Sequence, residues 1–272
     1  MAQRGAQART AQRGKPKRRP IGRTPPVSVI RALREEVGFG CPVPSCGNPY
    51  LSWHHFDPPW HVKQHHHPTG MIALCLTHHR QADAGAFTSE QLRQFKAGDN
   101  ANEVRGRLEW MRQSLLAVVG GSFYYEVPKV IQLGGRPLVW FERDEHGYML
   151  LGVRLPTLSG QPRVRVTRNF FEHIGTPEDF ECPPNGRLLR VRYADGDSLA
   201  IEFLNCESTE AFRERYQQPL AWNDVAFPLT LLEINLNIAG RRLTFTPDGA
   251  EIMGNRLVRG WSRNSNVGIS LD

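Results

Sequence analysis

Apolar residues recur every three or four positions in three stretches of the first half of the chain, which predicts three helices. The first opens at Ser28 and ends at Gly38. The second starts at the capping-box pattern Thr88-Ser-Glu-Gln91. The third runs from about 102 to 118, where Gly120-Gly121 ends it, and connects two domains. Its apolar stripe is expected to pack against the preceding domain or to form a homodimer; the stripe consists of Val104, Leu108, Met111, Leu115 and Val118.

From Phe123 onward the pattern changes to a period of two, which is typical of half-buried strands. Hairpins or strand ends with turn residues are expected within 137–155, 189–203, 234–240 and 247–249. One helix, from about Ser208 to Tyr216, interrupts the strands. Region 122–272 is therefore predicted to be a β-rich domain, a sandwich or an irregular barrel, and the fold class of the whole chain is α+β.

The 272 residues suffice for two domains of ordinary size, and 40% of them are hydrophobic, as in soluble globular proteins. No apolar run approaches the roughly 20 residues that cross a bilayer, so no membrane association is expected. Five cysteines is an odd number, and three of them lie among histidines. This favours reduced, metal-binding thiols and a cytoplasmic location over a disulfide framework.

Positive charge is concentrated at the N-terminus, although the whole chain carries a net charge of +7. Residues 1–26 have little to bury and are expected to form a disordered arm. The arm could attract nucleic-acid phosphates, or it could simply aid solubility. Its basic residues are Arg4, Arg9, Arg13, Lys15, Lys17, Arg18, Arg19 and Arg23.

The stretch 41–83 contains eight of the ten histidines and three of the five cysteines. Cys41-x4-Cys46 and Cys75-x2-His78 are two pairs at the spacing of zinc ligands, about thirty residues apart. Three thiolates and one imidazole make a closed tetrahedral set that suits structural zinc. A domain this small, with few large apolar residues, needs such a cross-link because its core alone is marginal.

The remaining histidines suggest a second metal site. His54 and His55 follow a short apolar run and are expected on a strand, where neighbouring side chains point to opposite sides. His79 and Asp83 lie four residues apart, on one face of a helix if Thr77 caps it. One strand histidine together with His79 and Asp83 would make a three-ligand site with open positions, which suits a catalytic rather than a structural ion.

The order of these motifs resembles the HNH endonucleases of the ββα-metal (His-Me finger) group. The resemblance covers about residues 30–97 and rests on Cys-x4-Cys, then His-His-Phe-x-Pro, then Ile-Ala-Leu-Cys-x2-His-His-x3-Asp. It implies a ββα-metal nuclease domain over 27–97 that cleaves DNA. It also implies that His55 is the general base, that His54 is a metal ligand, and that His79 and Asp83 are the further ligands.

The chemistry of phosphodiester hydrolysis agrees with these implied roles. An imidazole can accept a proton from water near neutral pH, and a divalent cation can offset charge on the leaving oxygen. Mg²⁺ or Mn²⁺ is expected, with Ni²⁺ or Zn²⁺ as alternatives. The chain departs from the family pattern at Gly70, where the motif has asparagine, and at Asp83, where it has histidine. A backbone carbonyl or a neighbouring histidine would have to replace the asparagine contact.

Other residues of this region are expected to be structural. Most of His61, His65, His66 and His67 are interpreted as solvated loop residues. Trp53 and Phe56 are expected in the small core. Cys182 and Cys206 lie in the β-rich region, without the spacing of a ligand pair, and are expected to be plain structural thiols.

The leading functional hypothesis is a metal-dependent HNH endonuclease, and by analogy it would act in bacterial or phage DNA restriction, defence or processing. One alternative is a zinc-stabilised DNA-binding module with an impaired active site. Another is a sensor or partner-binding protein that acts through the β-rich domain.

Overall fold

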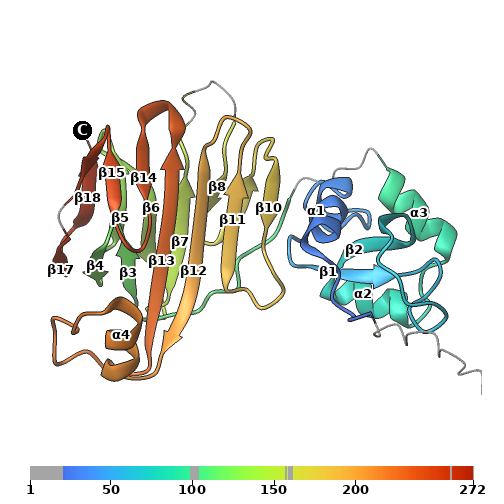
Figure 1. Cartoon of the computed structure of the whole chain (residues 1–272), viewed down its shortest axis with the longest axis horizontal. Coiled ribbons are helices and arrows are strands. Elements are labelled where there is room, and N and C mark those ends of the chain that lie inside the picture. Colours follow the sequence, from blue (N-terminus) through green and yellow to red (C-terminus); the bar gives the residue numbers. More distant parts are fainter. Residues whose placement is uncertain (1–20, 99–103, 157, 159–161, 258, 272) are drawn as a thin grey trace, which may run out of the picture.

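The chain folds into a small N-terminal module and a large β-sandwich (Figure 1). The computed structural model describes residues 21–98, 104–156, 158, 162–257 and 259–271. We call residues 21–98 the N-terminal module, residues 104–115 the connecting segment and residues 116–271 the β-sandwich. The mixture of helices and extended sheets agrees with the predicted α+β class. Within the described ranges, no helix has the length and apolarity needed to span a membrane.

The N-terminal module is built around a two-stranded antiparallel ribbon, in which Leu51 lies opposite Cys75 and His55 lies opposite Met71. The second strand is buried along its whole length between the helices. In chain order, the elements are α1 (Val27–Glu36), β1 (Leu51–His55), η1 (Pro68–Gly70), β2 (Met71–Cys75), α2 (Leu76–Asp83) and α3 (Ser89–Ala97). The helix α2 follows β2 without a connecting loop, so residues at the strand end and in the first helical turn are neighbours.

Local signals explain the ends of these helices. The predicted capping box is confirmed, because the backbone N–H of Gln91 donates to Thr88 Oγ1 at 3.1 Å and the N–H of Thr88 donates to Gln91 Oε1 at 2.9 Å. The predicted first helix is also present, but it begins at Val27 after Pro26. The expectation that Thr77 caps a helix is wrong, since α2 already begins at Leu76.

The β-sandwich consists of two sheets packed face to face. Within the described residues, ten strands form one sheet and six form the other, in the order β18-β5-β6-β7-β8-β9. The ten are β3 (Leu116–Val119), β4 (Ser122–Tyr125), β10 (Asp179–Glu181), β11 (Leu188–Arg192), β12 (Ser198–Cys206), β13 (Leu229–Ile238), β14 (Leu243–Phe245), β15 (Ala250–Ile252), β16 (Asn255–Arg256) and β17 (Trp261–Arg263). The six are β5 (Lys129–Leu133), β6 (Arg136–Arg143), β7 (Met149–Arg154), β8 (Arg165–Thr167), β9 (Phe170–His173) and β18 (Val267–Leu271).

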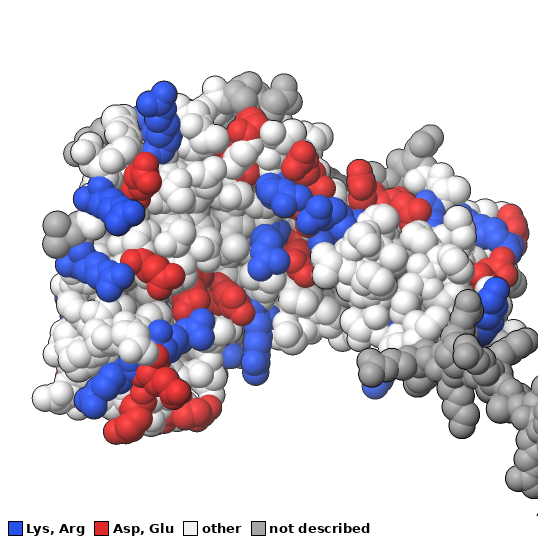
Figure 2. Space-filling view, in the orientation of Figure 1, with Lys and Arg blue, Asp and Glu red and all other residues white. Residues whose placement is uncertain are grey.

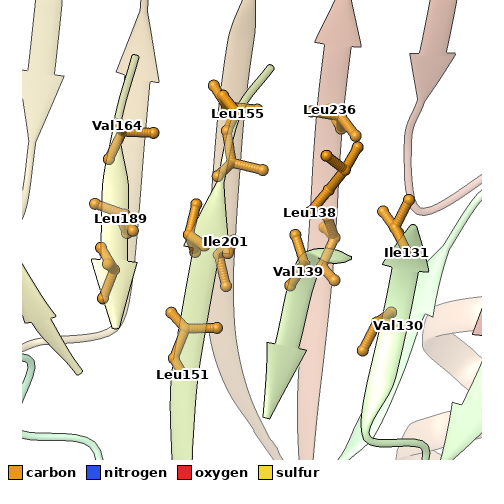
Figure 3. Packing of buried hydrophobic residues seen from close by; sticks show 14 of the residues in the cluster. Val130, Ile131, Leu138, Val139, Leu151, Leu155, Val164, Leu189, Ile201 and Leu236 are labelled. Atoms are coloured by element: carbon orange, nitrogen blue, oxygen red, sulfur yellow. The ribbon is translucent and has the colours of Figure 1, made fainter. Parts of the chain in front are cut away.

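Alternating apolar side chains from both sheets make the core, as the period of two predicted. Val139 and Leu151 come from one sheet, Leu189 and Ile201 from the other, and all four are at most 1% exposed (Figure 3). The expected hairpins are confirmed as β6–β7, β11–β12 and β14–β15. Helix α4 (Thr209–Tyr216) lies at the expected place, and η2 (Ala239–Arg241) follows β13.

The last strands join the two sheets. Strand β17 pairs in parallel with β4 in the ten-stranded sheet, and β18 pairs in parallel with β5 in the six-stranded sheet. Both are edge strands. The end of the chain therefore completes both layers of the sandwich.

The predicted helix at 102–118 is wrong. Residues 102 and 103 lie outside the described ranges, and 104–115 contain no helix. The backbone N–H of Leu108 donates to Asn169 O at 2.8 Å, and that of Arg105 donates to Gly47 O at 2.9 Å, so bonds to distant segments replace the helical ones. Leu116–Val119 is a strand, and Gly120-Gly121 is the turn to β4, with φ of 64° and 74°. The sandwich therefore starts at 116 rather than 122. The helix on which a homodimer surface was expected does not form, and all residues of its stripe except Met111 are buried.

The module and the sandwich are joined by a buried ion pair. Arg34 on α1 donates to Asp179 Oδ1 at 2.7 Å and lies 3.2 Å from Glu181 Oε1. Both Arg34 and Asp179 are buried. Next to them, the ring of Phe39 packs edge-on against Phe180 with 6.5 Å between ring centroids. These contacts fix α1 against strand β10 of the sandwich.

Candidate metal centres

The four predicted zinc ligands converge because of two tight local structures. Between Cys41 and Cys46 the chain turns back, as the N–H of Cys46 donates to Val43 O at 3.0 Å and the N–H of Gly47 donates to Cys41 O at 3.1 Å. Cys75 is the last residue of β2 and precedes α2 directly, and His78 lies in the first turn of that helix. The antiparallel ribbon then places the second pair beside the first.

The geometry of this group fits a tetrahedral metal site. The Sγ atoms of Cys46 and Cys75 are 3.9 Å apart, and His78 Nδ1 lies 3.3 Å from Cys41 Sγ and 3.2 Å from Cys75 Sγ. Zinc holds thiolates at about 2.3 Å, which separates two of them by about 3.8 Å in a tetrahedron. All four ligand atoms lie within 4.8 Å of one another. No cysteine of the described chain forms a disulfide. The group is therefore able to hold a metal ion.

The thiols of Cys41 and Cys75 share a hydrogen bond that shifts their pKa values in opposite directions. The hydrogen bond from Cys41 lowers the pKa of Cys75 to about 5, and the same bond together with burial raises the pKa of Cys41. Burial also raises the pKa of Cys46. Of these thiols, Cys75 therefore loses its proton most readily, and a cation bound here would release the remaining thiol protons.

A second group lies on the other side of α2. His54 Nδ1 is 3.1 Å from Asp83 Oδ1, and His79 Nε2 is 3.6 Å from Asp83 Oδ2. Two ligands held about 2.1 Å from an ion at right angles lie about 3.0 Å apart, so these distances suit a shared cation. Burial lowers the pKa of both His54 and His79, which keeps their ring lone pairs free of protons. Three ligands leave coordination positions open for water or substrate.

Ser52 orients His79. Its hydroxyl donates to Leu74 O at 3.1 Å, so at the His79 Nδ1 atom, 2.7 Å away, the hydroxyl oxygen can only accept. His79 therefore carries its proton on Nδ1, and Nε2 faces Asp83 with a free lone pair. Ser52 was missed in the sequence, although a position two residues before His54 shares the same face of the strand.

His55 leaves β1 on the side opposite to His54, as expected for neighbours on a strand. Its Nε2–H donates to His65 O at 3.0 Å, so Nδ1 carries the lone pair that can accept a proton. Burial lowers the pKa of His55 to about 4, and the imidazole is neutral at pH 7. The indole of Trp60 lies 4.7 Å away between ring centroids.

The loop that supplies this carbonyl is held by His65 and Gly70. His65 is 3% exposed, so its interpretation as a solvated residue is wrong. Its Nε2–H donates to Pro58 O at 2.9 Å, and its Nδ1 accepts from the N–H of His67 at 3.2 Å. A Cβ on Gly70 would lie 2.0 Å from Asp57 O, so this position excludes every side chain, asparagine included. The His65 carbonyl is thus the group that contacts His55 Nε2, and Gly70 offers no side chain that could do so.

Side chains from both faces of β1 line one pocket of about 390 Å³. Its lining includes His54, His55, His79 and Asp83. Arg23 also lines it and has no acidic partner among the described residues. His66 holds Gly22, the residue before Arg23, because its Nε2–H donates to Gly22 O at 2.8 Å. Residues 21–26, expected to be disordered, thus lie against the module. The other predicted arm residues, from Arg4 to Arg19, lie outside the described residues.

The charged side chains and the residues outside the two ligand groups have these positions in the structure. On the face shown in Figure 2, basic and acidic side chains alternate over both the sandwich and the module. Phe56 is buried and Trp53 packs against the same cluster, as expected for the small core. Cys182 and Cys206 are buried and join no converging ligand group of the described chain. Of the loop histidines, His61 and His67 are exposed.

Comparison of the chain with protein-family models, with curated proteins and with solved structures finds no match.

Proposed function

We propose that the chain is a metal-dependent endonuclease of the HNH type that hydrolyses DNA phosphodiester bonds. One observation carries this proposal: a three-ligand group and a neutral, oriented histidine line the same open pocket. The ligand atoms of His54, His79 and Asp83 converge, and His55 lines the same pocket with an unprotonated Nδ1. The ribbon β1–β2 followed by α2 has the element order of a ββα-metal unit.

Each residue then has a defined task. His54, His79 and Asp83 would hold the divalent cation, Mg²⁺ or Mn²⁺ with Ni²⁺ or Zn²⁺ as alternatives, and the cation would neutralise charge on the scissile phosphate and leaving oxygen. His55 takes a proton from the attacking water at Nδ1 while its Nε2–H remains bound to the carbonyl of His65. Arg23 supplies positive charge at the pocket rim, where a phosphate group would lie.

The second centre has a separate, structural task in this proposal. Cys41, Cys46, Cys75 and His78 would hold zinc and connect α1, the ribbon and α2. His78 and His79 are adjacent in the helix but belong to different centres. Zinc at the first centre thus fixes the helix that presents two ligands of the second.

Cleavage of supercoiled plasmid tests the proposal. The parent chain with Mg²⁺ or Mn²⁺ should nick or linearise the plasmid, and His55→Ala should lower the rate about 10²–10⁴-fold because it removes the general base. His67→Ala is the matched control, since this nearby imidazole is exposed and does not line the pocket. It should cleave like the parent, and both variants should keep their zinc.

A parent that binds plasmid without cutting it, or a His55→Ala variant that cuts equally fast, contradicts the enzymatic proposal. The first of these outcomes would favour a zinc-stabilised DNA-binding module.

A further inference from the structure

A second pocket, of about 620 Å³, opens at one end of the β-sandwich. Its walls come from the β5–β6 turn, the end of β7, the start of β8, the end of β9 and η2. None of its lining residues belongs to the N-terminal module. Its volume lies in the range of small-molecule sites, about 300–1,000 Å³.

The pocket is lined with positive charge, and no carboxylate is among its described lining residues. The lining residues that carry or can carry positive charge are Arg136, Arg154, Arg163, Arg165, Arg241 and His173. They come from separate strands and turns, so their convergence is produced by the fold and not by a run of basic sequence. Guanidinium groups placed this close repel one another unless an anion joins them.

Two of the arginines are already neutralised and serve as fixed walls. Arg163 is 4% exposed and pairs with Asp195 and Asp197. Arg165 lies 2.7 Å from Glu172 Oε2. These carboxylates offset part of the charge and hold the two guanidinium groups in place.

The other three arginines have no such partner. Within the described residues, no carboxylate lies within ion-pair distance of Arg136, Arg154 or Arg241, and Arg154 is instead placed over the ring of Trp140 at 5.9 Å. His173 also lines the pocket.

The pocket also has apolar walls. Leu133 and Leu158 line it above the buried Leu138, Leu155 and Val164, and Leu158 is 44% exposed. The backbone N–H of Leu155 donates to Val164 O at 3.2 Å, which places these two apolar residues side by side at the end of the core layer (Figure 3). A simple inorganic anion would leave this apolar surface in water.

We propose that this pocket binds a small organic anion, in which a phosphate or carboxylate group is joined to an apolar portion. Arg136, Arg154 and Arg241 bind the anionic group, and the side chains of Leu133 and Leu158 contact the apolar part. The proposal does not depend on the metal centres or on nuclease activity.

Isothermal titration of the full chain with three probes tests this site. The probes are adenosine monophosphate, decanoate and inorganic phosphate. One of the two organic anions should bind saturably and at least tenfold more tightly than inorganic phosphate. The tighter of the two identifies a phosphate or a carboxylate as the anionic group.

Arg136→Ala combined with Arg241→Ala should weaken that binding at least tenfold, because both residues are exposed at the pocket and have no structural partner. Arg213→Ala combined with Arg256→Ala removes the same charge from exposed positions outside the pocket and should leave binding unchanged. Equal melting temperatures of the two double variants confirm that both fold. Equal affinities in the two, no saturable binding of either organic probe, or equally tight binding of inorganic phosphate overturns the proposal.

Discussion

The N-terminal module and the β-sandwich hold their conformations by different means. In the module, a short ribbon and three short helices surround a small apolar cluster, and four sulfur and nitrogen atoms converge at its edge. In the sandwich, two sheets bury a continuous apolar layer, and its cysteines join no converging ligand group in the described chain. Stability is spread over many side chains in the sandwich and concentrated in a few in the module.

This difference matters for how each part tolerates change. A distributed core loses a few kcal/mol when one side chain is truncated, roughly 2–5 for a large aliphatic residue. A ligand group loses its function entirely when one member is removed, because the cation is then under-coordinated. The same contrast separates the candidate sites: the metal centres depend on single residues, whereas the arginine-lined pocket shares its charge among several.

The largest expected effect is the loss of the first metal centre. Cys75→Ser, or removal of metal by a chelator, should abolish the tightly bound zinc and unfold the module, because structural zinc contributes on the order of 10 kcal/mol. Calorimetry should then show only the unfolding transition of the sandwich. Metal analysis should find one structural zinc per parent chain.

Cys206→Ser is the matched control, since this thiol lies in the sandwich and donates to Ser208 O at 3.4 Å, a contact that serine can keep. It should retain the zinc and both transitions. A Cys75→Ser variant with an intact module would show that the module does not depend on this ligand group for its stability.

A smaller effect is expected at the junction of the two parts. Arg34→Ala should destabilise the packed pair by about 3 kcal/mol, because it leaves the buried Asp179 carboxylate without its main partner. Thermal unfolding should then show both transitions at lower temperatures than in the parent. Arg31→Ala removes a 46% exposed side chain 3.4 Å from the same carboxylate and should cost less than about 1 kcal/mol. Equal losses in the two variants would show that burial of the pair is unimportant.

The smallest effect on stability, about 1 kcal/mol, is expected for Ser52→Ala. Its main consequence should appear at the second centre, as Mn²⁺ affinity about 10–100-fold weaker, because His79 loses the contact that fixes its tautomer. Titration of Mn²⁺ into the zinc-loaded chain measures this. Thr77→Ala removes an exposed hydroxyl from α2, the helix that carries His79. This variant should bind Mn²⁺ like the parent. Unchanged affinity in Ser52→Ala would mean that His79 needs no orienting group.

Patterns that act locally could be predicted from the sequence. The capping box at Thr88, the strand alternation around Val191 and the i, i+4 relation of His79 and Asp83 each depend on neighbouring residues. The convergence of Cys41, Cys46, Cys75 and His78 also followed from spacing, because two tight pairs on one small module have few ways to be arranged.

Features that depend on distant backbone atoms could not be predicted. The apolar stripe of 104–118 fits a helix, yet its backbone N–H groups bond to Gly47 and Asn169, whose positions no local pattern reveals. The carbonyl of His65 reaches His55 only because the loop closes tightly at Gly70. The arginine-lined pocket collects residues from five separate elements and is invisible before the sheets are assembled.

The pairing of the last strands has a consequence for biosynthesis. Every element of the N-terminal module is synthesised within about the first third of the sequence, and the module can fold while synthesis of the sandwich continues. The sandwich must wait, because β17 and β18 cover the open edges of β4 and β5 and are translated after all the other described strands. Until then both edges are exposed to pairing with other nascent chains, so the time between the two folding events is when the polypeptide most needs chaperone protection.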